Sequence, residues 1–390
     1  MAHVVMCWEL GGGLGHVARL RPLADALRNR GDRVSFILRE TVAAERLLDP
    51  KHHTWLQAPL QAVPVAPACV PTRHLPHILY NVGFHDEQAL LGRMRAWRNL
   101  YAALKPDLLV FDHSPTALLA ARGLPVRRIV LGTGFGVPPQ VSPLPAFDVT
   151  DPPAPTDTVE QQILDRANAA LRVFGQAPLA HFVDIYEADA KLLFTLPELD
   201  HYPGRGEADY WGPPLQDGAE TPVWPEGPGK RVFAYLKPFK TLPALLETLR
   251  QAGLPTLIYT SQGELPPQMP PHIRHTPKPV DLTRAVQESD LVICHAGHGT
   301  VSAALLGGKP LLLLPSNIEQ RMLAARVHAG GMGLSAPALM PEGMRQKFAR
   351  LLEEASFTAA ARAFAERYAA LAVEKNPERF AALAEKLLGS

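Results

Sequence analysis

Short apolar runs alternate with amphipathic stretches along most of the chain. HVVMCW at 3–8 and RVSFIL at 33–38 are typical of buried strands, and residues 17–31 between them have helical periodicity. The order repeats at DLLVFD (107–112), which precedes a helical stretch and a further strand-like run at 126–132. Because strand, helix and strand follow one another with short connections, the pattern predicts a parallel sheet covered by helices.

The C-terminal half restarts the same rhythm. Strand-like runs at 231–236, 255–260, 290–295 and 310–315 alternate with amphipathic stretches. Two doubly wound, Rossmann-like α/β domains in tandem are the simplest architecture for this order. A stretch rich in proline and glycine separates the halves and suits a linker. We expect an N-terminal domain over 1–215, a linker over 216–229, a C-terminal domain over 230–360 and a terminal helix over 361–390 that crosses back to the first domain.

Charge and composition limit the partners. The chain has 390 residues, and its 39 basic and 38 acidic side chains nearly cancel. Without a field of one sign, binding to nucleic acid is not expected. The chain has three cysteines, no signal-like start and no apolar run of about 18–20 residues, so we expect a cytoplasmic protein without a transmembrane segment. The sequence leaves the oligomeric state open.

CHAGHGT (294–300) joins a strand-like run to a helix-like run. Open α/β sheets bind ligands at such junctions, and a helix N-terminus offers unpaired N–H groups to phosphate. Gly297 and Gly299 would let phosphate oxygens approach the backbone, and Thr300 and His295 would add donors. A tight turn with incidental histidines explains the same residues equally well. A Walker motif does not fit, because no Lys-Ser or Lys-Thr pair follows the glycines.

Glu319 and Gln320 follow the next strand-like run, at a second junction on the same edge of the predicted sheet. A carboxylate beside a carboxamide offers acceptors and donors to a polyol such as a sugar. Polar residues that simply open a helix are the alternative interpretation.

Together these segments resemble the C-terminal signature of family 1 glycosyltransferases of the UDP-glycosyltransferase and macrolide type. The family has the GT-B fold, in which two Rossmann-like domains face each other across a cleft. The resemblance implies a nucleoside-diphosphate sugar, with UDP or dTDP, as co-substrate and no other cofactor. Ala296 stands where the family has a glycine, and Glu319 stands where aspartate is commoner. The implied donor-binding residues are Gly13, Pro279, Val280, His295, Gly297, His298, Gly299, Thr300, Glu319 and Gln320.

The N-terminal stretch ELGGGLGH (9–16) is a glycine-rich loop between a strand and a helix. It is not a good dinucleotide fingerprint, because His16 occupies the third glycine position and would crowd a pyrophosphate. The stretch resembles the Gly-His opening of the same family, which implies that His16 is the general base. Arg19 stands where the family often has proline. The alternative is a histidine that only caps a helix.

A histidine base needs an acid that orients it and stabilises the imidazolium. Asp112 ends a later strand of the same predicted sheet, at the position of the family's partner aspartate. The alternative is an aspartate that caps the helix beginning near Ser114. His113, its neighbour, is a possible substitute base.

The resemblance implies inverting, metal-independent transfer of a sugar to an acceptor hydroxyl. The sequence contains no Asp-x-Asp motif, and the irregular spacing of Cys69, His74, His77 and His85 does not suit a zinc site. The acceptor, which we expect to be a small molecule, a lipid or a peptide, would contact segments 51–100 and 137–157. A peptidoglycan-type GlcNAc transferase, a nucleotide-sugar epimerase and a non-catalytic nucleotide-sugar binder stay open as alternatives.

Overall fold

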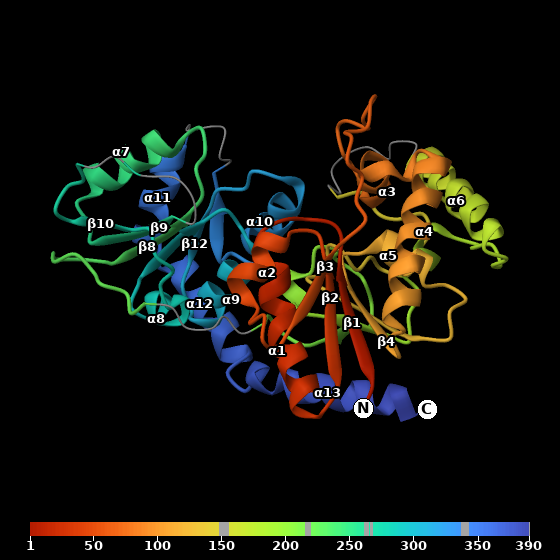
Figure 1. Cartoon of the computed structure of the whole chain (residues 1–390). Helices are drawn as coiled ribbons and strands as arrows, with labels where there is room; N and C mark the ends of the chain where they lie inside the picture. The colour runs from red at the N-terminus through yellow and green to blue at the C-terminus, as the bar shows by residue number, and fades with distance from the viewer. Residues whose placement is uncertain (148–155, 215–219, 261–264, 266–267, 337–342, 390) are drawn as a thin grey trace. The chain divides into compact units, whose positions relative to one another are not determined.

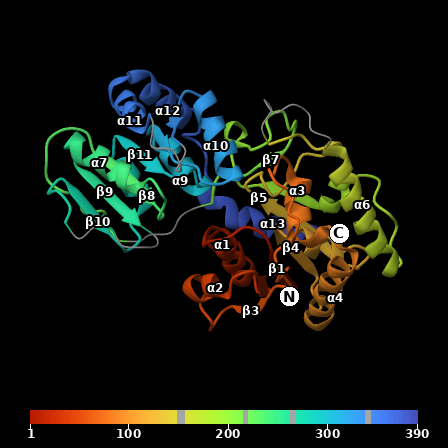
Figure 2. The ribbon, with the colours of Figure 1, turned by 90° about the horizontal axis from the view of Figure 1, so that it is seen from above.

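The computed structural model describes residues 1–147, 156–214, 220–260, 265, 268–336 and 343–389. The chain divides into two compact units (Figures 1 and 2). The first contains Met1–Phe194, Tyr202–Gly212 and Val373–Ser390, and the second contains Thr195–His201 and Pro213–Ala372. The described part of the expected linker and residues 361–372 therefore belong to the second unit.

The first unit is built on a parallel sheet with the strand order β3-β2-β1-β4-β5-β6-β7. Its strands are β1 (His3–Trp8), β2 (Arg33–Leu38), β3 (Thr54–Gln57), β4 (Leu108–Asp112), β5 (Arg127–Gly132), β6 (Ala190–Leu193) and β7 (Asp209–Tyr210). Its helices are α1 (Gly15–Asn29), α2 (Thr41–Leu47), α3 (Leu75–Leu79), α4 (Glu87–Leu104), α5 (Pro115–Ala120), α6 (Thr156–Val173) and α13 (Asn376–Gly389), with short turns η1 (Tyr80–Phe84), η2 (Phe182–Tyr186) and η4 (Val373–Lys375).

The second unit repeats the plan with the parallel order β10-β9-β8-β11-β12-β13. Its strands are β8 (Val232–Leu236), β9 (Thr256–Thr260), β10 (Ile273–Thr276), β11 (Leu291–Cys294), β12 (Leu311–Leu313) and β13 (Gly333–Ser335). Its helices are α7 (Leu242–Ala252), α8 (Leu282–Gln287), α9 (His298–Leu306), α10 (Ile318–Ala329), α11 (Met344–Glu353) and α12 (Ala355–Arg367), with the short turn η3 (Pro197–Leu199).

The last helix, α13, completes the core of the first unit. Figure 1 shows it beside α1, and the Arg30 guanidinium donates a hydrogen bond to the Ala381 carbonyl at 2.7 Å. Phe380 and Ala384 are fully buried in the same apolar cluster as the β1 side chains. Asn376 donates to the Trp211 carbonyl at 2.7 Å. The C-terminal segment is therefore part of the N-terminal unit, because its apolar face finds its partners there.

In both units the central strands are buried on both faces, as expected for parallel strands between helical layers. Parallel strands all end at one edge of the sheet. The loops after β1 and β4 are therefore neighbours in the first unit, and the loops after β11 and β12 are neighbours in the second. These two edges carry most of the residues that the sequence points to.

Candidate active site

His16 lies in the first turn of α1, directly after the glycine loop that follows β1. Gly11 and Gly13 have φ angles of +84° and +86°, a region that residues with a side chain rarely adopt. The imidazole stacks on the Trp8 ring, with centroids 4.7 Å apart and planes tilted by 18°. The indole of Trp8, itself fixed by a hydrogen bond from Nε1 to the Leu10 carbonyl, holds the ring in place.

The structure brings His16 and Asp112 together. Trp8 and Asp112 are register partners on β1 and β4, so Asp112 lies beside the start of the glycine loop. Its Oδ2 is 3.1 Å from Nδ1 of His16 and 3.5 Å from Nη2 of Arg19. Asp112 is buried, and His16 keeps 15% of its side chain exposed. Burial opposes ionisation of Asp112, but Arg19 and His16 outweigh it and hold the carboxyl pKa below its usual value.

Asp112 does not cap the following helix, which was the alternative interpretation. The residue before α5 is Ser114, and no side chain caps the helix from that position. The backbone N–H groups of Thr116 and Ala117 instead donate to Oε2 of Glu9, at 2.9 and 3.3 Å. The carboxylate of Asp112 is therefore free of that task and faces His16.

Glu9 is a residue that the sequence reasoning missed. It is buried at the end of β1, and its carboxylate ties that strand to the start of α5. Burial raises the pKa of Glu9 to about 7, against the opposing effect of the Thr116 hydroxyl and Arg93. An acidic residue directly after a fully apolar strand was the available signal, because a charged group rarely takes such a position without a buried partner.

His113 follows Asp112 with a φ angle of +48°. Burial, and then the neighbouring His16, lower the pKa of His113 to about 3. An imidazole that releases its proton so easily is a weak base. His113 is therefore a poor substitute for His16 as the group that takes a proton.

The second group of sequence-predicted residues lies where β11 leads into α9. Gly297 precedes the helix, and a side chain at this position would meet open space. The first N–H groups of α9, from His298, Gly299 and Thr300, lack acceptors within the helix. This end of the helix suits an anion. Ala296 has a φ angle of +56°, which explains why glycine is usual at that position of the motif.

Two histidines of the motif have protein partners. His295 Nδ1 lies 2.9 Å from the Leu314 carbonyl, and its Nε2 lies 3.1 Å from the Lys237 carbonyl. His298 Nε2 contacts the Thr195 hydroxyl at 2.7 Å. Neither ring directs an unoccupied nitrogen at the N-terminus of α9. Both side chains hold the loop in shape through these contacts.

Glu319 and Gln320 begin α10, the helix after β12. The Gln320 side-chain oxygen accepts hydrogen bonds from the Ser316 N–H at 2.8 Å and from its hydroxyl at 2.9 Å. Asn317 caps the helix by accepting from the Gln320 N–H at 3.0 Å. Both side chains are half-buried. They therefore lie at the start of the helix that follows β12, the strand that pairs with β11 in the second unit.

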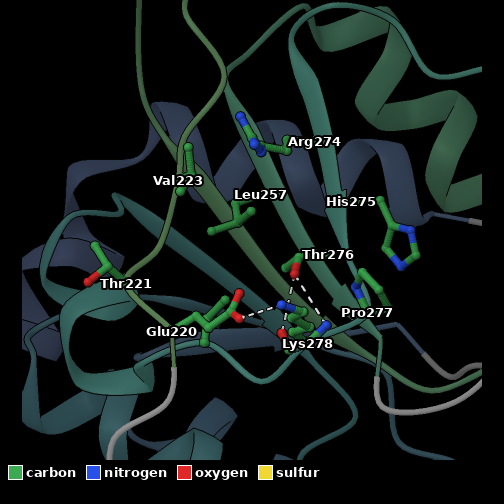
Figure 3. Close-up of a pocket in the computed structure, with 10 residues that line it drawn as sticks. Glu220, Thr221, Val223, Leu257, Arg274, His275, Thr276, Pro277 and Lys278 are labelled. Atoms are coloured by element: carbon green, nitrogen blue, oxygen red, sulfur yellow. Dashed lines mark hydrogen bonds and ion pairs between the residues drawn. The ribbon is translucent and has the colours of Figure 1, made fainter.

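Val280 lines a pocket of about 250 Å³ in the second unit, and Pro279 precedes it in the chain. The Pro279 carbonyl accepts from the Glu220 N–H at 3.0 Å, and the Glu220 carbonyl accepts from the Asp281 N–H at 2.8 Å. Lys278 pairs with the Glu220 carboxylate at 2.7 Å (Figure 3). Pro279 has no N–H, and its carbonyl already has one partner. A nucleobase of the donor that contacts this backbone would have to use the remaining lone pair of the Pro279 carbonyl or the backbone of Val280.

Known proteins are similar to this chain in part of its sequence and in its fold. Residues 275–375 match the model of the glycosyltransferase family 28 C-terminal domain. A PGL/p-HBAD biosynthesis glycosyltransferase of Mycobacterium tuberculosis is 34% identical over 86 residues, which are 22% of this chain and 20% of that protein. The chain matches a fifth or less of the length of the curated relatives.

Solved structures match over the whole chain. The spinosyn rhamnosyltransferase SpnG superposes with a TM-score of 0.70 at 18% identity and covers 100% of both chains. The glycosyltransferase VinC, solved with dTDP, superposes with a TM-score of 0.69 at 18% identity, over 98% of this chain and 100% of that one. The fold is GT-B. The fold expected from the family resemblance is confirmed.

Across the described ranges, no three histidine, cysteine, aspartate or glutamate side chains converge as metal ligands. His74 and His77 instead lie ring against ring, with centroids 3.9 Å apart. In the same ranges no helix has the length and apolar character needed to cross a membrane.

Gly11→Ala is expected to separate the position of His16 from its identity. A Cβ on Gly11 would lie 2.7 Å from Nε2 of His16, so the ring must move. A displacement of this kind costs about 10- to 100-fold in activity. The control is Gly31→Ala, which has a φ angle of +99° but meets no neighbour. Both variants should lose about 1 kcal/mol of stability from backbone strain; equal activity in both would contradict the role of the loop.

Proposed function

We propose that the protein transfers a sugar from a UDP- or dTDP-sugar to a hydroxyl of a small-molecule acceptor, with inversion at the anomeric carbon and without a metal ion. The observation that carries the proposal is the His16–Asp112 contact beside the glycine loop. A buried, ionised carboxylate against Nδ1 favours the tautomer with its proton on that nitrogen. Nε2 then carries a lone pair that can take a proton.

The proposed step balances as follows. The acceptor hydroxyl gives its proton to Nε2 of His16, and its oxygen forms a bond to the anomeric carbon of the donor. The bond from that carbon to the diphosphate oxygen breaks, and the nucleoside diphosphate leaves with the electron pair. Asp112 stays ionised and stabilises the imidazolium, while Arg19 stabilises Asp112.

The leaving diphosphate gains negative charge in the transition state. The N–H groups at the start of α9 and the Thr300 hydroxyl are the groups proposed to stabilise it. Support for this class of donor comes from relatives of the same fold, since VinC is solved with dTDP and SpnG with thymidine diphosphate. SpnG is also solved with spinosyn aglycone, which favours a small-molecule acceptor over a lipid or a peptide.

A donor-hydrolysis assay tests the proposal without knowledge of the acceptor. UDP- and dTDP-sugars are incubated with the protein in chelator, and release of the nucleoside diphosphate is measured. The anomeric configuration of the released sugar, read by NMR, is expected to be inverted. Retained configuration, or activity that needs an added metal, would contradict this mechanism. Binding of nucleotide without turnover of any donor would indicate a non-catalytic binder.

Thr300→Ala is expected to weaken the binding of dTDP or UDP in chelator by about 1.5 kcal/mol, the lower end for a hydrogen bond to a charged group. The hydroxyl lies in the first turn of α9, where it can add one donor to the backbone N–H groups. Thr300→Ser keeps the hydroxyl and is the matched control. Titration calorimetry measures both, and equal loss in the two variants would assign the effect to packing rather than to phosphate binding.

A further inference from the structure

The carboxylate of Glu9 ties the end of β1 to the start of α5. Its Oε2 accepts hydrogen bonds from the N–H groups of Thr116 and Ala117, at 2.9 and 3.3 Å. All three residues are buried, and Glu9 keeps only 2% of its surface exposed. A buried N–H group that loses its acceptor is costly, because water does not reach it as a replacement. The position of the first turn of α5 therefore depends on this side chain.

The segment between Asp112 and this tie has a strained backbone. It consists of residues 113–115, and His113 has a φ angle of +48°, which is rare for a residue with a side chain. The Leu10 N–H donates to the His113 carbonyl at 2.9 Å, and the Ser114 hydroxyl donates to the Asp112 carbonyl at 3.2 Å. A strained residue keeps its conformation only where the surrounding structure fixes it. The segment therefore depends on contacts along its length and at both ends.

The two ends of the segment are both held by β1. At the first end, Asp112 is the register partner of Trp8, whose ring stacks on His16 with centroids 4.7 Å apart. At the other end, Glu9 holds the first N–H groups of α5. Neighbouring residues of one chain segment thus place both members of the His16–Asp112 contact.

Without the tie, the strain at His113 could relax toward negative φ. Such a rotation turns the peptide group that joins His113 to Asp112, and it moves the aspartate side chain relative to His16. We infer that Glu9 is a positioning residue for the proposed reaction, which keeps the Asp112 carboxylate against Nδ1 of His16 through its hydrogen bonds to the start of α5. The inference rests on the proposed function and deepens it, because it adds a residue that acts only through Asp112.

The tie requires an acceptor at Glu9 rather than a negative charge. The oxygen of a carboxamide accepts N–H groups as a carboxylate oxygen does, whereas a thioether sulfur is a weak acceptor. Glu9→Gln therefore keeps the tie, and Glu9→Met keeps an unbranched side chain but removes the acceptor. The two variants form a matched pair, because both lose the charge and only one loses the hydrogen bonds.

The tautomer of His16 tests the inference without donor or acceptor. Nitrogen NMR is recorded on protein labelled in its histidine rings, at a pH where the ring is neutral and with His16→Ala to assign the signal. Wild type and Glu9→Gln are expected to carry the proton on Nδ1. Glu9→Met is expected to show a mixture of both tautomers, because the carboxylate no longer lies against Nδ1. The same tautomer distribution in the two Glu9 variants would overturn the inference.

Donor hydrolysis supplies a second test. Glu9→Met is expected to lower kcat for release of the nucleoside diphosphate about 10- to 100-fold and to change KM for the donor by less than about threefold, as for a displaced catalytic group. Glu9→Gln should stay within about threefold of wild type, since it keeps the acceptor. Asp112→Asn should cost less activity in the Glu9→Met background than in wild type, because both changes act on one contact. Losses that simply multiply would give Glu9 a general structural role and overturn the inference.

A second pair of variants covers the case in which Glu9→Met does not fold. His113→Val and His113→Asn both remove the imidazole, but valine resists positive φ and asparagine tolerates it. The proton of His16 is expected to stay on Nδ1 in His113→Asn and to be shared between the two nitrogens in His113→Val. Equal tautomers in these two proteins would mean that the segment does not control Asp112, which would also overturn the inference. Melting temperatures check the folding of every variant.

These outcomes separate two kinds of failure. If the wild-type protein releases no nucleoside diphosphate from any donor, or carries the His16 proton on Nε2, the proposed function fails. If the wild-type protein turns over donors with the proton on Nδ1, but Glu9→Met and Glu9→Gln behave alike, only the inference about Glu9 fails.

Discussion

His16→Ala is expected to lower glycosyl transfer by about 10² to 10⁴, the usual contribution of a general base, while affinity for the nucleoside diphosphate stays nearly unchanged. The physical reason is that His16 belongs to the first unit, whereas residues 294–300, which are proposed to bind the diphosphate, belong to the second. Loss of the imidazole removes the proton acceptor but no group proposed to hold the donor. Single-turnover kinetics and titration calorimetry measure the two quantities separately.

Asp112→Asn provides the matched comparison. The amide keeps the shape of the side chain but loses the charge that opposes Nδ1 of His16 at 3.1 Å. Its effect should be smaller than that of His16→Ala, and the double variant should lose no more than His16→Ala alone, because both act through one proton transfer. A His16→Ala enzyme with full turnover would mean that the histidine only begins α1. Fully additive losses would mean that the two side chains act independently.

Glu9→Gln is expected to remove a dependence of stability on pH that the wild-type protein shows. The folded pKa of Glu9 is raised from 4.5 to about 7, so between these values the folded state binds a proton that the unfolded state has released. Stability from this group is therefore fully present below pH 4.5 and is lost as the pH rises through 7. The full shift corresponds to about 3 kcal/mol.

Denaturant titrations at pH 5 and pH 8 measure this effect. Between these two pH values, the difference in free energy of unfolding between wild type and Glu9→Gln should change by about 2 to 3 kcal/mol in favour of the variant as the pH rises. The comparison between two pH values cancels any constant cost, such as the loss of the interaction with Arg93. A carbon NMR titration of the Glu9 carboxyl gives its pKa directly. A wild-type protein and a variant with parallel pH profiles would show that Glu9 ionises at its ordinary value.

The sequence was sufficient to predict the architecture. Periods of apolar and polar residues are local signals, and the short connections between strand and helix leave few topologies other than two parallel sheets. The same reasoning placed His16 and Asp112 at one sheet edge, because parallel neighbours end together. The resemblance of CHAGHGT to a donor-binding motif could also be recognised from the sequence. The reason is that a helix N-terminus offers its backbone N–H groups to an anion without help from distant side chains.

Other assignments depended on which distant groups a side chain meets in the folded chain, and the sequence alone does not show this. His295 and His298 belong to the motif, yet their nitrogens lie against carbonyls and a hydroxyl from distant segments. Within segment 51–100, where contact with the acceptor was expected, Leu75, Leu79 and Phe84 are fully buried and belong to the core of the first unit.

The sequence by itself therefore determined the order of helices and strands, the two loops proposed to bind and react with the substrates (9–16 and 294–300), and the residue types in those loops. What only the tertiary structure decided is how each polar group is used. The N–H groups of α5 are satisfied by Glu9, which leaves Asp112 for His16. Burial and the neighbouring His16 lower the pKa of His113, and Gly136 gives its ring room. Such outcomes depend on burial and on partners far apart along the chain, which folding alone brings together.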